Sequence, residues 1–139
     1  MKVLVTGAAG QAGAALVEWA PAWAEVSATT RQALDIADAD AVRACVSDLM
    51  PAVIVNAAAW TNVDGAEADE QGALAANGTG PENLARAAGS TGARIVHLST
   101  DYVFPGDSAA PLPPDHPVQP INAYGRSKLD GERRVLGQL

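Results

Sequence analysis

The sequence is poor in cysteine, histidine and positive charge. Its single cysteine, Cys45, excludes an internal disulfide, and with only two histidines it leaves no cluster of residues suited to hold a metal. Nine Lys and Arg against sixteen Asp and Glu exclude a basic surface for nucleic acid or anionic membranes. No apolar run approaches the roughly 20 residues that cross a bilayer. No leader segment precedes the first apolar stretch. We therefore expect a reduced, cytoplasmic protein without a membrane span.

The 139 residues, 48 % of them hydrophobic, suffice for one domain. Short β-branched runs alternate with longer alanine-rich segments, which predicts a doubly wound α/β fold around a parallel sheet. The expected strands are 2–6, 25–29, 52–56 and 94–99, and the expected helices are 11–19, 39–50 with Asp38 as its cap, 66–88, and 122 onward. Glycines at 72, 78 and 80 allow a split in the third helix. Six prolines in residues 105–120 predict a surface loop.

A glycine-rich turn follows the first expected strand, with Gly7, Gly10 and Gly13 three residues apart. A pyrophosphate can reach the N–H groups at a helix N-terminus only where no Cβ atom obstructs it. The third glycine also lets the helix pack closely on the sheet. A tight turn of this composition needs no ligand, so the position between strand and helix is what favours a dinucleotide site.

The end of the second expected strand lacks the acidic residue that usually binds the ribose 2′-hydroxyl. The segment instead contains Thr29, Thr30 and Arg31, two hydroxyls and a guanidinium that suit a 2′-phosphate. This favours NADP over NAD, although a solvated loop arginine would have the same sequence. Asp35 and Ile36 follow in a loop that can flank the adenine.

Tyr124 and Lys128 are four residues apart near the start of the last expected helix and therefore share one face. A lysine cation nearby favours the phenolate form of tyrosine, and Lys128 can also bind the nicotinamide ribose. A hydroxyl at the end of the fourth strand, Ser99 or Thr100, then orients a carbonyl that Tyr124 protonates. These parts predict a carbonyl reductase. The alternative is an exposed helical pair without catalytic function.

The loop after the third expected strand contains Ala57, Ala58 and Ala59, followed by Trp60 and Thr61. It lies at the carboxyl edge of the sheet, where open α/β folds bind ligands. Small side chains there let a dinucleotide lie flat, although ordinary alanine packing explains them equally well.

Four segments together resemble the motifs of the dTDP-4-dehydrorhamnose reductase family of extended short-chain dehydrogenases: residues 6–13, 56–64, 99–106 and 124–128. The similarity runs from Met1 to about Val135, and Ser-Thr-Asp-Tyr-Val-Phe is its most diagnostic part. The resemblance implies reduction of the C4 ketone of dTDP-4-dehydro-L-rhamnose with NADPH or NADH. It also implies that Tyr124 is the proton donor with Lys128 as its partner, that Thr100 orients the carbonyl, and that Asp101 contacts substrate. The implied cofactor residues are Gly10, Gln11, Ala12, Asp35, Ile36, Ala59, Trp60 and Thr61.

The sequence departs from this family in two respects. Some members bind magnesium at a dimer interface through a glutamate on the first helix, where this sequence has Ala15, so we expect no metal. Members are also longer, so we expect residues 1–139 to form an incomplete NAD(P)-binding Rossmann domain that lacks the last strands and the substrate domain. The expected consequence is an exposed apolar sheet face. The chain is then a fragment or depends on another chain, and a homodimer is one assembly to test.

Three other functions remain open. A related nucleotide-sugar epimerase or dehydratase uses the same Tyr–Lys pair but retains its cofactor. A non-catalytic NADP-binding subunit needs no reactive groups, and the presence of Thr100, Tyr124 and Lys128 argues against it. An inactive fragment is the third alternative.

Several other residues have structural interpretations. We expect His97 to be a packed core histidine, and Trp19 and Trp23, one helical turn apart, to pack against the sheet. The acidic residues of the third helical segment fit a solvated helix start: Asp64, Glu67, Asp69 and Glu70.

Overall fold

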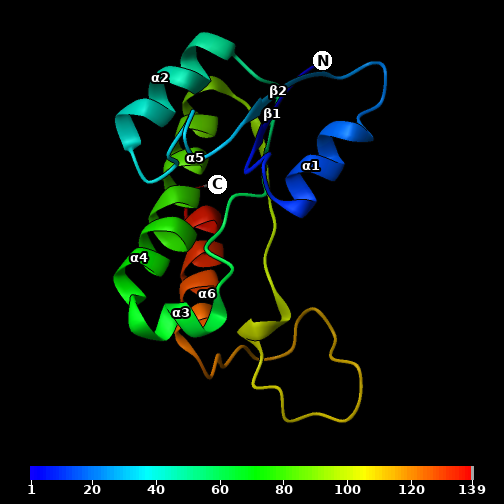
Figure 1. Cartoon of the computed structure of the whole chain (residues 1–139). Coiled ribbons are helices and arrows are strands. Elements are labelled where there is room, and N and C mark those ends of the chain that lie inside the picture. The colour runs from blue at the N-terminus through cyan, green and yellow to red at the C-terminus, as the bar shows by residue number, and fades with distance from the viewer. Residues whose placement is uncertain (139) are drawn as a thin grey trace.

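The computed structural model describes residues 1–138 and contains a four-stranded parallel sheet in the order β2-β1-β3-β4 (Figure 1). The strands are β1 Lys2–Thr6, β2 Glu25–Thr29, β3 Val53–Asn56 and β4 Arg94–His97. All four lie where the sequence predicts, although β3 begins one residue later and β4 ends two residues earlier than expected. The chain runs outward from β1 to β2 and then crosses to β3, so the strand order reverses beside β1. The prediction of a doubly wound α/β fold is confirmed.

Helices cover both faces of the sheet, with α1 on one side and α2 and α5 on the other (Figure 1). Their bounds are α1 Gln11–Glu18, α2 Ala39–Leu49, α3 Val63–Ala68, α4 Glu70–Leu74, α5 Gly80–Thr91 and α6 Ala123–Leu136. A π-helical turn, Ala75–Thr79, joins α4 to α5, and a 3-10 turn, Asp101–Val103, follows β4. The long helix expected over 66–88 is therefore split.

Side-chain caps fix two of the helix starts that the sequence predicts. The Asp38 carboxylate accepts hydrogen bonds from the backbone N–H groups of Asp40 and Ala41, each at 3.0 Å. The Asn122 side chain accepts from the N–H of Gly125 at 2.7 Å. The caps thereby set where α2 and α6 begin, and α6 is the helix that carries Tyr124 and Lys128.

The core lies between the sheet and the α2–α5 layer. Leu4 of β1 and Ile54 of β3 are fully buried there against side chains of both helices, Val42, Val46, Leu84, Ala87 and Ala88. Burial of these large apolar side chains is the main term that holds the two helices on the sheet.

The prediction that Trp19 and Trp23 pack against the sheet is wrong, because they are 80 % and 63 % exposed. Helix α1 ends at Glu18, so Trp19 lies beyond its last turn and Trp23 lies in the connection to β2. The two rings instead line an open apolar groove of about 470 Å³ on the α1 side of the sheet.

The proline-rich segment forms neither helix nor strand between residues 105 and 120, as expected. The N–H of Gln119 donates to the carbonyl of Val103 at 2.9 Å and closes this loop at its base. Among residues 1–138 we find no helix with the length and apolar character to span a bilayer.

Candidate active site

The candidate site lies where the four strands end together. In the parallel register, Thr6 at the end of β1 pairs with Thr29 of β2 and Asn56 of β3, and Asn56 pairs with His97 of β4. The loops that follow the strands therefore open onto a single edge of the sheet. This carboxyl edge, beside the reversal in strand order, is where open α/β sheets bind dinucleotides.

The glycine turn is shaped by two close backbone approaches. Gly7 has φ +73°, and a Cβ there would lie 2.5 Å from the backbone nitrogen of Ala58. A Cβ on Gly13 would overlap the carbonyl oxygen of Gly7, so only glycine lets α1 begin so close to the turn. No side chain caps the N-terminus of α1, whose exposed first residues are Gln11 and Ala12. Its first N–H groups are therefore free to bind an anion.

An open cleft of about 600 Å³ adjoins the glycine turn, lined by Ala9, Thr30, Arg31, Gln32 and Asp35. The Arg31 side chain is 81 % exposed, and its Nε lies 3.7 Å from Oδ2 of Asp35. Such an exposed pair contributes little energy, so the guanidinium can turn to another anion. Ile36 follows Asp35 in the chain, and its side chain is buried.

Contacts on both sides of Thr100 attach the segment after β4 to α6. The Lys128 ammonium donates to the carbonyl of Leu98 at 2.5 Å. Four residues later the ring of Tyr102 stacks edge-on against that of Tyr124, with centroids 5.4 Å apart. Thr100 lies midway between these attachments, so the structure brings its segment against the helix that carries Tyr124 and Lys128.

The two hydroxyls at the end of β4 have different surroundings. Ser99 is exposed and donates to a carboxylate oxygen of Glu132 on α6. Thr100 makes only local contacts, because its Oγ1 accepts from the N–H of Tyr102 and donates to Asp101, both at 3.2 Å. This difference favours Thr100 as the hydroxyl available to a substrate. Asp101 is exposed beside it.

Lys128 is an almost fully buried cation, with 2 % of its surface exposed. Burial lowers the pKa of its ammonium to about 8, because water no longer stabilises the charge, while the Glu132 carboxylate acts in the opposite direction. A lysine with this pKa can hold or release a proton close to neutral pH.

Asn77 connects the predicted cofactor loop to α6, a role that the sequence analysis missed. Its fully buried side chain accepts from the N–H of Trp60 at 2.8 Å and donates to the carbonyl of Trp60 at 3.1 Å. It also donates to Oγ of Ser127 at 2.9 Å, and Ser127 donates to the carbonyl of Tyr124 at 2.7 Å. The signal in the sequence is an asparagine followed by glycine inside an alanine-rich segment.

Asn56 is a second buried amide without a predicted role. Its Oδ1 accepts from the Thr6 hydroxyl at 2.6 Å and from the N–H of Ala58 at 3.1 Å. Its Nδ2 lies 3.0 Å from Nδ1 of His97 and donates to it, which places the ring proton on Nε2. Asn56 thus ties three strand ends to the loop after β3. His97 is half-buried at the end of β4, consistent with a structural histidine.

We expect acid to destabilise the fold through His97. Burial lowers its pKa from 6.5 to about 4, and the nearby Lys128 charge contributes. The unfolded chain therefore takes up this proton first, so stability present above about pH 6.5 is lost as the pH falls toward about 4. Because the ring is partly exposed, we expect the free energy of unfolding to fall by only about 2 kcal/mol. Urea unfolding at several pH values measures this loss. His97→Gln should flatten this dependence, and an unchanged slope would assign the loss to other groups.

The four acids expected to be solvated are all exposed, and Asp64 and Glu70 lie in the first turns of α3 and α4. Two of the four also contact the start of α6, which the sequence did not predict. Glu67 accepts from the N–H of Ala123 at 2.6 Å, and Glu70 pairs with Arg126 at 3.0 Å. Asp69 caps α4.

The predicted site residues fall into two groups at the same sheet edge. One surrounds the glycine turn and the Arg31 cleft, and the other surrounds α6. Trp60 belongs to the second, half-buried in a small cluster that includes Tyr124, while Ala59 and Thr61 are exposed. The binding roles of both groups remain predictions. Within residues 1–138, no three His, Cys, Asp or Glu side chains gather in a way that could hold a metal.

Comparison with known proteins identifies the family. The family described as "RmlD substrate binding domain" matches residues 1–139. The dTDP-4-dehydrorhamnose reductase of Streptomyces griseus is 49 % identical over 98 % of this chain and 45 % of its own length. The dTDP-4-keto-6-deoxy-D-glucose reductase of Streptomyces niveus is 50 % identical over 98 % of this chain and 48 % of its own length.

A solved structure shows the same fold. The dTDP-4-dehydrorhamnose reductase of Bacillus anthracis, in complex with NADP, is 38 % identical and superposes with a TM-score of 0.96 over 99 % of this chain and 49 % of that chain. The chain thus spans about half the length of the relatives it matches. The family resemblance in the sequence is confirmed, and the chain belongs to the RmlD substrate binding domain family.

Proposed function

We propose that this chain supplies the dinucleotide site and the proton-donating groups of a reductase. The reaction is the reduction of the C4 ketone of dTDP-4-dehydro-L-rhamnose to dTDP-L-rhamnose with NADPH or NADH. The observation that carries the proposal is the attachment of residues 98–102 to α6 on both sides of Thr100, which holds Thr100 beside the helix of Tyr124 and Lys128. On this proposal residues 1–139 are an NAD(P)-binding domain of a cytoplasmic enzyme, and a homodimer is the first assembly to test.

The residues at the sheet edge fit a dinucleotide. The uncapped N-terminus of α1 offers N–H groups to a pyrophosphate, and Gly7 and Gly13 keep the backbone there free of side chains. The adjoining cleft, with Arg31 at its wall, suits an adenosine that carries a 2′-phosphate. When bound, the dinucleotide supplies the hydride for C4 of the sugar.

The side chains on α6 and after β4 supply the proton chemistry. The Thr100 hydroxyl donates a hydrogen bond to the ketone oxygen and orients it. The Tyr124 phenol then transfers its proton to that oxygen as the alcohol forms. The Lys128 ammonium favours the phenolate that remains. Asn77 and Ser127 hold the backbone of Tyr124 in place for this transfer.

Turnover by the 139-residue chain tests the proposal. We expect loss of NADPH absorbance on addition of dTDP-4-dehydro-L-rhamnose, matched mole for mole by dTDP-L-rhamnose. Reduction of dTDP-4-keto-6-deoxy-D-glucose is measured in parallel, because the Streptomyces niveus relative is named as a reductase of that sugar nucleotide. Sugar isomerisation without net loss of NADPH would favour an epimerase, and binding without turnover would favour a non-catalytic subunit or an inactive fragment.

Replacing Arg31 with alanine should weaken NADPH binding about tenfold and leave NADH binding unchanged, because only NADPH has the 2′-phosphate. The dissociation constants are measured by the fluorescence of each reduced cofactor. Arg43→Ala is the matched control, since Arg43 is also exposed and pairs with an aspartate, Asp40, but lies on α2 outside the cleft. Equal losses for the two cofactors would show that Arg31 does not contact the 2′-phosphate.

A further inference from the structure

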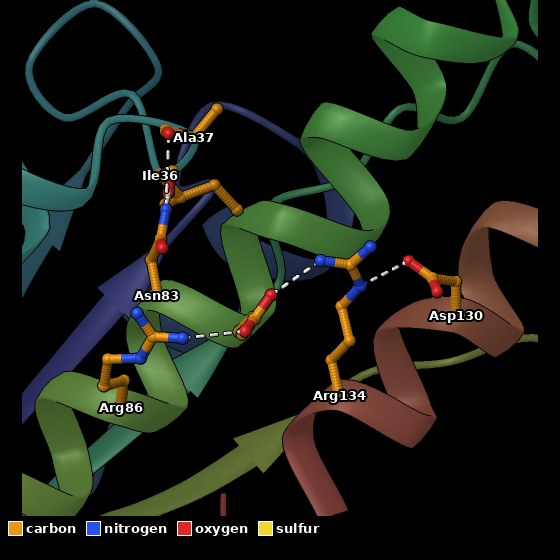
Figure 2. Close-up of polar contacts among 7 residues, drawn as sticks. Ile36, Ala37, Asn83, Arg86, Asp130 and Arg134 are labelled. Carbon is orange, nitrogen blue, oxygen red and sulfur yellow. Dashed lines mark hydrogen bonds and ion pairs between the residues drawn. The ribbon is translucent and has the colours of Figure 1, made fainter. Parts of the chain in front are cut away.

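One buried amide holds the segment behind the adenosine cleft. The Nδ2 of Asn83, in the first turn of α5, donates to the carbonyl oxygens of Ile36 at 3.0 Å and Ala37 at 3.2 Å (Figure 2). The Asn83 side chain is nine-tenths buried, and Ile36 is 5 % exposed. Residues 36 and 37 belong to the connection between β2 and α2, so without Asn83 these two carbonyls lose their amide donor.

The same turn of α5 also holds the Ile36 side chain. A Cβ added to Gly80 would lie 2.5 Å from Cγ1 of Ile36, so the isoleucine occupies the space above this glycine. The connection is thus fixed to α5 through both its backbone and its side chain. A change at either contact must move the connection, since the helix itself is packed in the core.

The fixed segment continues directly into the wall of the cleft. The carboxylate of Asp35 accepts from the N–H of Ala37 at 3.0 Å, so the position of Ala37 sets the orientation of Asp35. Asp35 and its partner Arg31 both line the cleft. A displacement of residues 36 and 37 therefore displaces two of the groups that face an adenosine.

The neighbouring residue on α5 points elsewhere. Glu82 pairs with Arg86 at 2.8 Å and with Arg134 of α6 at 2.6 Å, and Arg134 also pairs with Asp130 (Figure 2). This ionic cluster joins α5 to α6, and within residues 1–138 none of its hydrogen bonds or ion pairs reaches residues 35–37. It therefore offers a control in the same helical turn.

We infer that Asn83 is a positioning residue for the adenosine half of the dinucleotide. The inference rests on the proposed function. Asn83 does not touch the ligand; it holds the Ile36–Ala37 backbone so that Asp35 and Arg31 are already in place when the adenosine arrives. A loop that must be ordered on binding lowers affinity, whereas one ordered beforehand does not.

Binding of adenosine 2′,5′-bisphosphate to the 139-residue chain tests this role by calorimetry. Asn83→Asp keeps the side-chain shape but replaces the donating NH₂ with a carboxylate oxygen that repels the two carbonyls. We expect its Kd to rise at least about tenfold over that of the natural chain. Glu82→Gln should lower Tm by breaking the ionic cluster and leave Kd unchanged. This split between Tm and Kd distinguishes a positioning role from a purely structural one.

Gly80→Ala provides a second route if Asn83→Asp does not fold, because the added methyl displaces Ile36 and should raise Kd in the same way. All affinities are measured below the Tm of each variant, with folding checked by circular dichroism. Unchanged affinity in the folded variants, with a natural chain that binds, would overturn the inference alone. A natural chain that binds no adenosine 2′,5′-bisphosphate would overturn the NADP proposal and this inference with it.

Discussion

Tyr124→Phe should lower kcat by about 10²–10⁴-fold and leave both the dinucleotide affinity and the fold unchanged. The substitution removes a single oxygen, the one that we propose transfers the proton to the ketone. The ring remains to stack against Tyr102 and to pack beside Trp60, so the packing of α6 is preserved. Turnover is followed by NADPH absorbance, affinity by NADPH fluorescence and folding by Tm.

Tyr102→Phe is the matched control for this prediction. The ring of Tyr102 lies against that of Tyr124, and the Tyr102 hydroxyl makes no hydrogen bond within residues 1–138. Removing that hydroxyl should change kcat less than about twofold. Equal losses in the two variants would mean that the pair acts by packing and would contradict proton transfer from Tyr124.

Asn77→Ala should lower the free energy of unfolding by about 3–5 kcal/mol. The Asn77 amide is fully buried and satisfies both backbone groups of Trp60 as well as the Ser127 hydroxyl. Truncation leaves a buried donor and a buried acceptor without partners and adds a small cavity. This is a large share of the roughly 5–15 kcal/mol that stabilises a typical domain. Urea unfolding monitored by circular dichroism measures the change.

Ser127→Ala gives the scale for that measurement. It removes the hydrogen bond from Asn77 and the one to the Tyr124 carbonyl but leaves the two bonds to Trp60 in place, so we expect a loss of about 1–2 kcal/mol. A loss for Asn77→Ala no larger than this would show that water takes over the contacts of the missing amide.

The parts of this fold that depend on neighbouring residues could be predicted from the sequence. The apolar strand Lys2–Thr6, the Asp38 cap and the split in the third helix follow from hydrophobic pattern, capping and glycine content, which act over a few residues. The glycine turn was predictable for the same reason. Both the positive φ of Gly7 and the close start of α1 are set within one strand-to-helix connection.

The parts that depend on distant partners could not be predicted. Asn77 hydrogen-bonds groups 17 and 50 residues away, and Glu67 accepts from a backbone N–H 56 residues away. Nothing in the local sequence marks these side chains as partners of distant groups. The error at Trp19 has another cause, because the helix ends one residue before it, and helix ends are the least predictable positions from sequence.

The hydrogen bond between Gln119 and Val103 brings the two ends of the proline-rich loop together next to the start of α6. This hydrogen bond fixes the position of the loop ends without help from the residues between them. Insertions, deletions and changes of surface charge in this loop should change the free energy of folding little. Lengthening a loop that is already closed adds only a small cost in conformational entropy. A change of length or charge within residues 105–118 therefore leaves the start of α6 in place.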